Sequence, residues 1–322
     1  MAAETVRLTC DDATADIAVG LGFNCYSWKT CFAGDEIGST PRELLWADSD
    51  MPDGDPRPSR SGIPLLAPFP GRIGGAAFDW ESKRYQLEEN GGNGNSIHGF
   101  ALRTPWHVEK SMSDRVTATF LPSRDAPEDA ARWPGDYQIT ATYTLETHRL
   151  LLDLRIENTS DESVPYGFGT HAYFRLPLAE GADPEATLVH APVDGVWEAE
   201  EMIPTGEVTP LPDDSLPSGG PLAGREFDTV FRLADRGAVT EVRDPTTGRT
   251  VRQTFDDSMT CCVIYTPGHR EAICLEPYTC VPDPFGLEAK GVASGLRALK
   301  PGEAYETQIV LEALTVASTR NA

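Results

Sequence analysis

The chain has 322 residues, of which 40% are hydrophobic and 24% are charged, a composition typical of soluble globular proteins with a large core. Its 50 acidic and 27 basic residues give a net charge of −23, which repels polyanions. The charge therefore argues against nucleic acid or an anionic membrane surface as partner and favours a neutral small molecule.

The N-terminal segment MAAETVRLTCDDATADIAV carries acidic residues where a signal peptide has basic residues followed by an apolar stretch. The sequence contains no run of about 20 apolar residues of the kind that crosses a membrane. Seven cysteines form no Cys-x-x-Cys pair, which favours reduced thiols over disulfides or a zinc site. We therefore expect a cytoplasmic protein, a monomer or homodimer, without a bound metal.

Short stretches of alternating polar and apolar residues recur along the chain, whereas helical periodicity is scarce. In chain order, the expected strands lie near residues 7–8, 15–19, 76–85, 116–121, 195–198, 260–265 and 272–275. In the longest pattern, two runs of alternate apolar residues each share a face: Ile139, Ala141, Tyr143 and Leu145, then Leu150, Leu152, Leu154 and Ile156. This pattern predicts a hairpin that turns near Glu146 to Arg149, within an all-β antiparallel sandwich.

Two segments crowded with Pro, Gly and Asp, at residues 48–62 and 207–224, predict surface loops. Either segment has the composition of a linker between domains. The candidate site residues named below lie on both sides of each loop and have to converge in space. We therefore interpret both loops as excursions of a single domain that spans residues 1–322.

Three polar residues stand beside strand-like or glycine-flanked sequence, where chemistry is favoured over simple solvation. Glu276 follows an apolar strand and precedes Pro277, so we expect its carboxylate at a sheet margin, where burial raises the pKa toward that of a working base. His171 lies beside apolar residues and His98 follows a glycine-rich stretch. Locally, a solvated glutamate, a core histidine and a turn histidine are the competing interpretations.

Several segments, ordered along the chain, resemble blocks of the aldose 1-epimerase (galactose mutarotase) superfamily. The segment GIPLLAPFPGRI at 62–73 resembles the family's Gly-Ile-Pro stretch, which ends in a sugar-contacting arginine, here Arg72. NGNSIHGF at 93–100 is similar to the family's Asn-x-x-x-His-Gly motif, here with His98 and with Asn95 one residue nearer to it than in the motif. GTHAYFRL at 169–176 is similar to the block that supplies the catalytic histidine, here His171.

Two further segments complete the resemblance. FDTVF at 227–231 resembles the segment whose aspartate binds sugar hydroxyls, here Asp228. CLEPYTCVPDPFGL at 274–287 resembles the block with the catalytic glutamate, here Glu276. The resemblance covers almost the whole chain and implies the family's fold, an antiparallel β-supersandwich of the galactose mutarotase type, and its activity, the interconversion of the α and β anomers of a hexose.

The implied reaction opens a hemiacetal: a base removes the proton of the C1 hydroxyl, an acid protonates the ring oxygen, and the ring recloses on the other face. Neither a metal nor another cofactor is needed. We assign Glu276 as base and His171 as acid, and expect Arg72, His98 and Asp228 to bind the sugar. Trp106, Phe174 and Tyr278 are candidates for an apolar wall, although a core position is the better interpretation of each.

The sequence departs from the family pattern in ways that concern the substrate. Thr170 replaces the family's usual asparagine before the catalytic histidine, which removes an amide that can hold a hydroxyl or orient the imidazole. HGFALRTPW at 98–106 is closer to the related hexose-6-phosphate epimerases, and Arg60, Arg72 and Arg103 are then candidate phosphate ligands. A hexose-6-phosphate 1-epimerase, or a non-catalytic carbohydrate-binding protein on the same scaffold, is therefore an alternative.

Overall fold

The structure, a computed structural model, describes residues 3–36, 38–52, 57–234 and 238–316. It is built mainly from antiparallel strands, and its α-helices are short: α1 (Pro122–Asp125), α2 (Pro127–Ala130), α3 (Ser215–Ser218) and α4 (Pro284–Ala289). Within these described ranges, no helix has the length and apolar character needed to cross a membrane.

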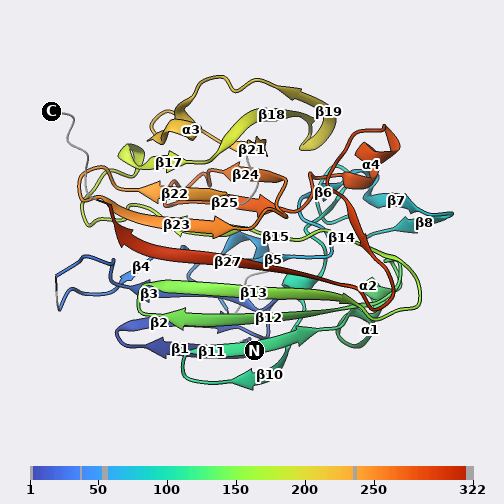
Figure 1. Cartoon of the computed structure of the whole chain (residues 1–322), viewed down its shortest axis with the longest axis horizontal. Helices are drawn as coiled ribbons and strands as arrows, with labels where there is room; N and C mark the ends of the chain where they lie inside the picture. The colour runs from blue at the N-terminus through green and yellow to red at the C-terminus, as the bar shows by residue number, and fades with distance from the viewer. Residues whose placement is uncertain (1–2, 37, 53–56, 235–237, 317–322) are drawn as a thin grey trace.

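The largest sheet has nine strands, and Figure 1 shows β11, β12, β13 and β27 side by side across its width. In spatial order the strands are β10 (His107–Ser111), β11 (Arg115–Phe120), β12 (Tyr137–Glu146), β13 (Arg149–Asn158), β27 (Ala304–Thr315), β23 (Arg249–Phe255), β22 (Val239–Arg243), β17 (Leu188–His190) and β20 (Gly220–Pro221). The C-terminal strand β27 thus lies at the centre of the sheet, between strands from the middle of the chain.

A second sheet has eight strands, seven of them on its main path. In spatial order they are β19 (Ile203–Thr209), β18 (Val193–Glu200), β21 (Asp228–Leu233), β24 (Cys261–Tyr265), β25 (Ala272–Tyr278), β15 (Gly169–Thr170) and β5 (Leu65–Leu66), with β16 (Ala172–Arg175) also paired to β25. The N-terminal sheet is β1 (Thr5–Cys10), β2 (Ala13–Ala18), β3 (Asn24–Thr30) and β4 (Arg42–Glu43). Three small pairs are β6 (Arg72–Ile73) with β9 (Ser96–Ile97), β7 (Ala77–Trp80) with β8 (Lys83–Gln86), and β14 (Val164–Tyr166) with β26 (Arg297–Leu299).

The main hydrophobic core lies between the two large sheets. It combines Leu152 and Ile309 of the nine-stranded sheet with Ile273 and Leu275 of β25. The buried Gln253 of β23 also donates a hydrogen bond to the carbonyl oxygen of Leu275, at 3.1 Å. Because alternate residues of a strand point to opposite faces, Ala272, Cys274, Glu276 and Tyr278 of β25 point away from this core. That second face carries the candidate site.

The antiparallel all-β fold expected from the sequence is confirmed. The predicted hairpin is also confirmed, because β12 and β13 pair in register from Tyr137 opposite Asn158 to Glu146 opposite Arg149. That the chain forms one domain stays a prediction, supported by a single core cluster with members from Leu8 to Ala313.

Two local predictions were wrong. Residues 76–85 do not form one strand, because the chain turns at Glu81, where φ is +54°, and the two halves pair as β7 and β8. The segment 207–224 is only partly a loop, since it includes the end of β19, helix α3 and β20. The other expected loop, 48–62, contains a 3₁₀ turn at Pro58–Arg60, and its residues 53–56 lie outside the described ranges.

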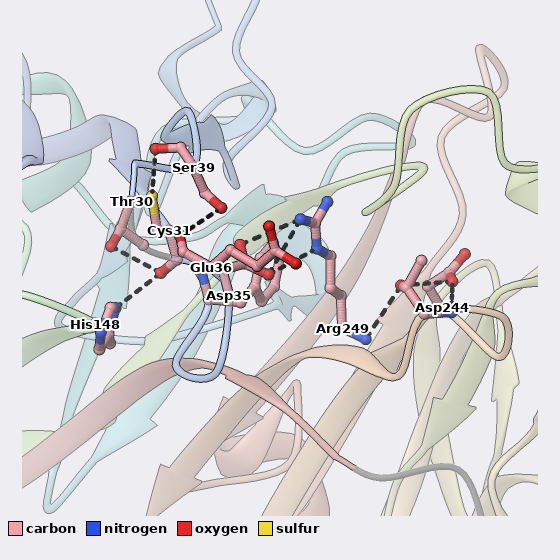
Figure 2. Close-up of polar contacts among 10 residues, drawn as sticks. Thr30, Cys31, Asp35, Glu36, Ser39, His148, Asp244 and Arg249 are labelled. Carbon is pink, nitrogen blue, oxygen red and sulfur yellow. Dashed lines mark hydrogen bonds and ion pairs between the residues drawn. The ribbon is translucent and has the colours of Figure 1, made fainter.

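Side-chain contacts fasten the segment after β3 to neighbouring strands, as Figure 2 shows. Arg249, at the start of β23, donates to the two carboxylate oxygens of Asp35 at 3.1 and 3.2 Å. Its guanidinium also lies 5.2 Å from the centre of the Phe32 ring. The carbonyl oxygen of Cys31 lies 2.9 Å from Nδ1 of His148. These contacts tie the N-terminal sheet to the nine-stranded sheet.

Candidate active site

A cavity of about 590 Å³ opens on the face of β25 that points away from the main core. Five predicted site residues line it together: Arg72, His98, His171, Asp228 and Glu276. They come from segments more than 200 residues apart in the chain and from both the eight-stranded sheet and the small β6–β9 pair. The structure therefore brings the whole predicted set to one place.

Glu276 lies within β25, paired to Val263 of β24, rather than at a sheet margin as the sequence suggested. The prediction of a margin was wrong because Pro277 does not end the strand, which continues to Tyr278. The Glu276 side chain is only 1% exposed. Its Oε2 accepts a hydrogen bond from the Tyr278 hydroxyl, whereas Oε1 makes no hydrogen bond to another described residue.

His171 lies between β15 and β16, and its position is set by the 62–66 segment beside it. Its backbone N–H donates to the carbonyl oxygen of Pro64 at 3.1 Å. Its ring stacks on that of Tyr173, with 4.8 Å between centroids and 5° between planes. This places Nε2 3.3 Å from Oε1 of Glu276, close enough for a proton to pass between the two side chains.

Thr170, the residue before His171, does not orient the imidazole by a hydrogen bond. The Thr170 side chain is fully buried, and its hydroxyl makes no hydrogen bond to a residue in the described part of the chain. Nδ1 of His171 likewise has no such partner. The imidazole is therefore oriented by stacking on Tyr173 rather than by a neighbouring amide.

Burial controls the protonation of the His171–Glu276 pair. It raises the pKa of Glu276 well above 4.5, against the Tyr278 hydrogen bond that lowers it. It lowers the pKa of His171 to about 3. Burial therefore favours the uncharged forms of both side chains, with the titratable proton of the pair on Glu276. One proton shared by two groups supplies one acid and one base, which is what hemiacetal opening needs.

His98 is fixed by an unusual backbone. Its φ is +64°, and the next residue, Gly99, has a φ of +66°. A Cβ atom at Gly99 would lie 2.2 Å from the carbonyl oxygen of Ala67, so only glycine fits there. The Gly71 N–H donates to Nδ1 of His98 at 3.2 Å. Because Nδ1 is an acceptor, the neutral ring carries its proton on Nε2, which is then free to donate to a ligand. Burial also lowers the pKa of His98.

Arg72 and Asp228 supply opposite charges to the cavity wall. Nε of Arg72 donates to the carbonyl oxygen of Gly91 at 3.2 Å, which orients the guanidinium. Asp228 begins β21, where partial burial raises its pKa and the charge of Arg72 opposes that rise. By contrast, Asn95 accepts a hydrogen bond from the Gly75 N–H and has a structural role.

The arginines expected to bind a phosphate are not equally placed. Arg60 and Arg72 line the cavity and form no ion pair with another described residue. Arg103 also lines the cavity, but it contacts Glu88 at 2.8 Å and Asp129 at 3.3 Å, so its charge is already matched. Its assignment as a phosphate ligand is therefore not supported. Arg57, which the sequence did not single out, lines the cavity too.

The sequence did not predict the roles of Tyr173 and Tyr278, which contact His171 and Glu276. Tyr173 and Tyr278 both line the cavity. The predicted strand ended at Leu275; had it been extended to Tyr278, the alternation of side chains would have placed Tyr278 on the same face as Glu276. Trp106 and Phe174 belong to the main core, which confirms the interpretation preferred from the sequence over an apolar wall. Tyr278 lines the cavity, as an apolar wall requires, but it contacts the site through its hydroxyl, which donates a hydrogen bond to Glu276.

One group in the described part of the chain has a metal-binding composition. His171, Cys274 and Glu276 place potential ligand atoms within 4.8 Å of one another. Burial raises the pKa of the Cys274 thiol well above 9, however, and metals bind the thiolate. The site therefore suits proton exchange better than metal binding.

The comparisons with known proteins agree with this geometry. The model of the aldose 1-epimerase family matches residues 38–312, a range that contains all five predicted site residues. The chain belongs to the aldose 1-epimerase family. In this aldose 1-epimerase family member the matched region begins before β4 and ends within β27.

Among the relatives of this family member, the uncharacterized protein YphB of Escherichia coli K12 is 24% identical over 256 residues, 76% of this chain and 81% of that protein. Galactose mutarotase of Sus scrofa is 30% identical over 150 residues, only 44% of this chain and 40% of that enzyme. A galactose mutarotase-like protein from Clostridium acetobutylicum has the same fold, with a TM-score of 0.86 at 22% identity over 97% of this chain and 95% of that one.

Proposed function

We propose that this protein is an aldose 1-epimerase that interconverts the α and β anomers of a hexose through His171 and Glu276. The observation that carries the proposal is the pair itself: Nε2 of His171 and Oε1 of Glu276 lie 3.3 Å apart on a sugar-sized cavity. Both side chains are at least nine-tenths buried, and Oε1 has no hydrogen-bond partner among the described residues.

In the proposed reaction, the carboxylate of Glu276 removes the proton from the C1 hydroxyl while the imidazolium of His171 protonates the ring oxygen. The bond between C1 and the ring oxygen breaks, and O1 becomes the aldehyde oxygen. After rotation about C1–C2, neutral His171 removes the proton of the ring hydroxyl as its oxygen attacks the other face of the aldehyde, and protonated Glu276 returns its proton to O1. Both side chains regain their starting protonation states, so protons and electrons balance over the cycle.

These roles require a proton to move when sugar binds, because burial places it on Glu276 in the empty cavity. A hydroxyl that donates to Oε1 stabilises the carboxylate, and the proton then passes to His171 across the 3.3 Å gap. Arg72 and Nε2 of His98 donate to sugar oxygens, whereas Asp228 accepts from hydroxyls.

Polarimetry of freshly dissolved α-D-galactose and α-D-glucose tests the proposal. We expect the protein to accelerate mutarotation, and Glu276→Gln and His171→Asn to reduce it to the spontaneous rate. Matched controls are Glu180→Gln and His107→Asn, which change exposed side chains outside the cavity and should keep full activity. Sugar binding measured by calorimetry without any anomerisation would instead identify a non-catalytic carbohydrate-binding protein.

A second candidate substrate is an aldose with an anionic group, such as a hexose 6-phosphate. Arg60 and Arg72 favour it, because two cationic side chains that form no ion pair with another described residue line one cavity of a chain with a net charge of −23. If this reading holds, kcat/KM for glucose 6-phosphate exceeds that for glucose, and Arg60→Gln removes the difference. Arg115→Gln, at an exposed position away from the cavity, is the control. Equal or better turnover of free glucose would reject the anionic substrate.

A further inference from the structure

We propose that Tyr278 is a positioning residue that holds Glu276 with Oε1 facing His171 and stabilises its carboxylate form. This inference rests on the proposed function. Tyr278 and Glu276 lie two residues apart on β25, so their side chains share the face that lines the cavity. The Tyr278 hydroxyl donates to Oε2 of Glu276, which leaves Oε1 toward Nε2 of His171.

The Tyr278 ring is held firmly enough to position another side chain. It is 1% exposed and packs in a cluster with Leu66, Val230 and Cys261. Its backbone pairs with Gly169 of β15, two residues before His171. A Cβ atom at Gly169 would lie 2.3 Å from Cδ1 of the Tyr278 ring. The Tyr278 ring therefore packs directly on the backbone of Gly169. This contact joins β25, which carries Glu276, to the segment that carries His171.

Other groups around Glu276 do not provide this hydrogen bond. The ionisable side chains packed near it, besides Tyr278, are His171, Tyr173, Asp228, Cys261, Cys262, Tyr265 and Cys274. Burial raises the pKa of the thiols and phenols, so these stay uncharged near neutral pH, and Asp228 contributes repulsion. Among the described residues, Tyr278 alone donates a hydrogen bond to the Glu276 carboxylate.

A hydrogen bond to the charged form of an acid favours that form. Tyr278 thus opposes the burial that keeps the proton on Glu276. It makes the carboxylate–imidazolium arrangement, the one that reacts, easier to reach. Without the hydroxyl, the proton stays on Glu276 more often, and the pair gives up its last proton only at higher pH.

The test is the pH dependence of kcat/KM for wild type and Tyr278→Phe, measured by polarimetry on the best sugar of the panel. In Tyr278→Phe we expect the maximum of kcat/KM to fall about tenfold, and the pH at which kcat/KM declines on the alkaline side to rise by about one unit. Both changes follow from the loss of a hydrogen bond to a charged group. Tyr137→Phe is the matched control, because it removes a buried hydroxyl that lies on β12, outside the cavity. Tyr137→Phe should keep both the wild-type maximum of kcat/KM and the wild-type pH of the alkaline decline.

A second measurement does not need activity. Infrared spectra against pH, with the protonated carboxyl band of Glu276 assigned by its loss in Glu276→Gln, should show this carboxyl deprotonating at higher pH in Tyr278→Phe. If the carboxyl band disappears at the same pH in both proteins and the alkaline decline of kcat/KM does not move, the proposed role of Tyr278 is overturned. This holds even if the maximum of kcat/KM falls through a loss of packing. Wild-type protein that accelerates no aldose would overturn the proposed function instead, so the two failures are distinguishable.

Discussion

Replacing His171 by glutamine should change how the stability of the protein depends on pH. In the folded protein burial lowers the pKa of His171 from 6.5 to about 3. Below pH 6.5 His171 of the unfolded chain therefore binds a proton that it does not bind in the folded chain, so the His171 contribution to the free energy of unfolding falls as the pH falls. The raised pKa of Glu276 contributes with the opposite sign, but that residue is present in every variant compared below. Between pH 7 and pH 5 this loss amounts to about 2 kcal/mol, at about 1.36 kcal/mol for each pH unit below 6.5.

Urea unfolding at pH 7 and pH 5 measures this effect in wild type, His171→Gln and the exposed-site control His107→Gln. His171→Gln should lose about 2 kcal/mol less between the two pH values than wild type, whatever its stability at pH 7. The lowered pKa of His98 adds a loss of the same sign, but it is present in all three proteins. Parallel pH dependence in wild type and His171→Gln would refute the burial argument.

Three further changes have defined outcomes. Gly99→Ala should destabilise the protein by about 1–3 kcal/mol in thermal unfolding, because φ is +66° and a Cβ would meet the Ala67 carbonyl oxygen; an unaltered melting temperature would contradict the geometry. Arg249→Gln should cost about 2 kcal/mol in urea unfolding, through loss of the Asp35 contacts, and leave polarimetric activity intact. Asp228→Ala should raise KM about tenfold or more with a smaller change in kcat; a fall in kcat alone would assign Asp228 to the chemistry.

Much of the fold was predictable, because a strand with one buried face has alternating polar and apolar residues in its sequence. The β12–β13 hairpin shows this best, since both of its apolar runs point into the core and every alternate residue except Leu151 is polar. Prediction failed at residues 76–85, because the turn there depends on the left-handed backbone of Glu81, and no glycine nearby indicates a turn. The short strands that flank the cavity were equally hard to see, because two-residue strands such as β15 contain no period.

The candidate site was predictable only as a set. Each of His98, His171 and Glu276 was ambiguous on local sequence, and their order along the chain pointed to a family in which such residues converge. Distances and hydrogen bonds could not be predicted. The pairing of Arg103 with Glu88 and Asp129 joins separate segments, and no local pattern reveals it. The proton on Glu276 likewise follows from burial, which is a property of the folded chain.

Strand β25 serves two parts of the molecule at once. Ile273 and Leu275 fill the space between the large sheets, while Glu276 and Tyr278 stand on the opposite side of the same few residues. A change of volume at either core position that moves the strand also moves the carboxylate. Stabilising this protein by repacking its interior is therefore expected to alter turnover, and positions remote from β25 are the safer targets for engineering.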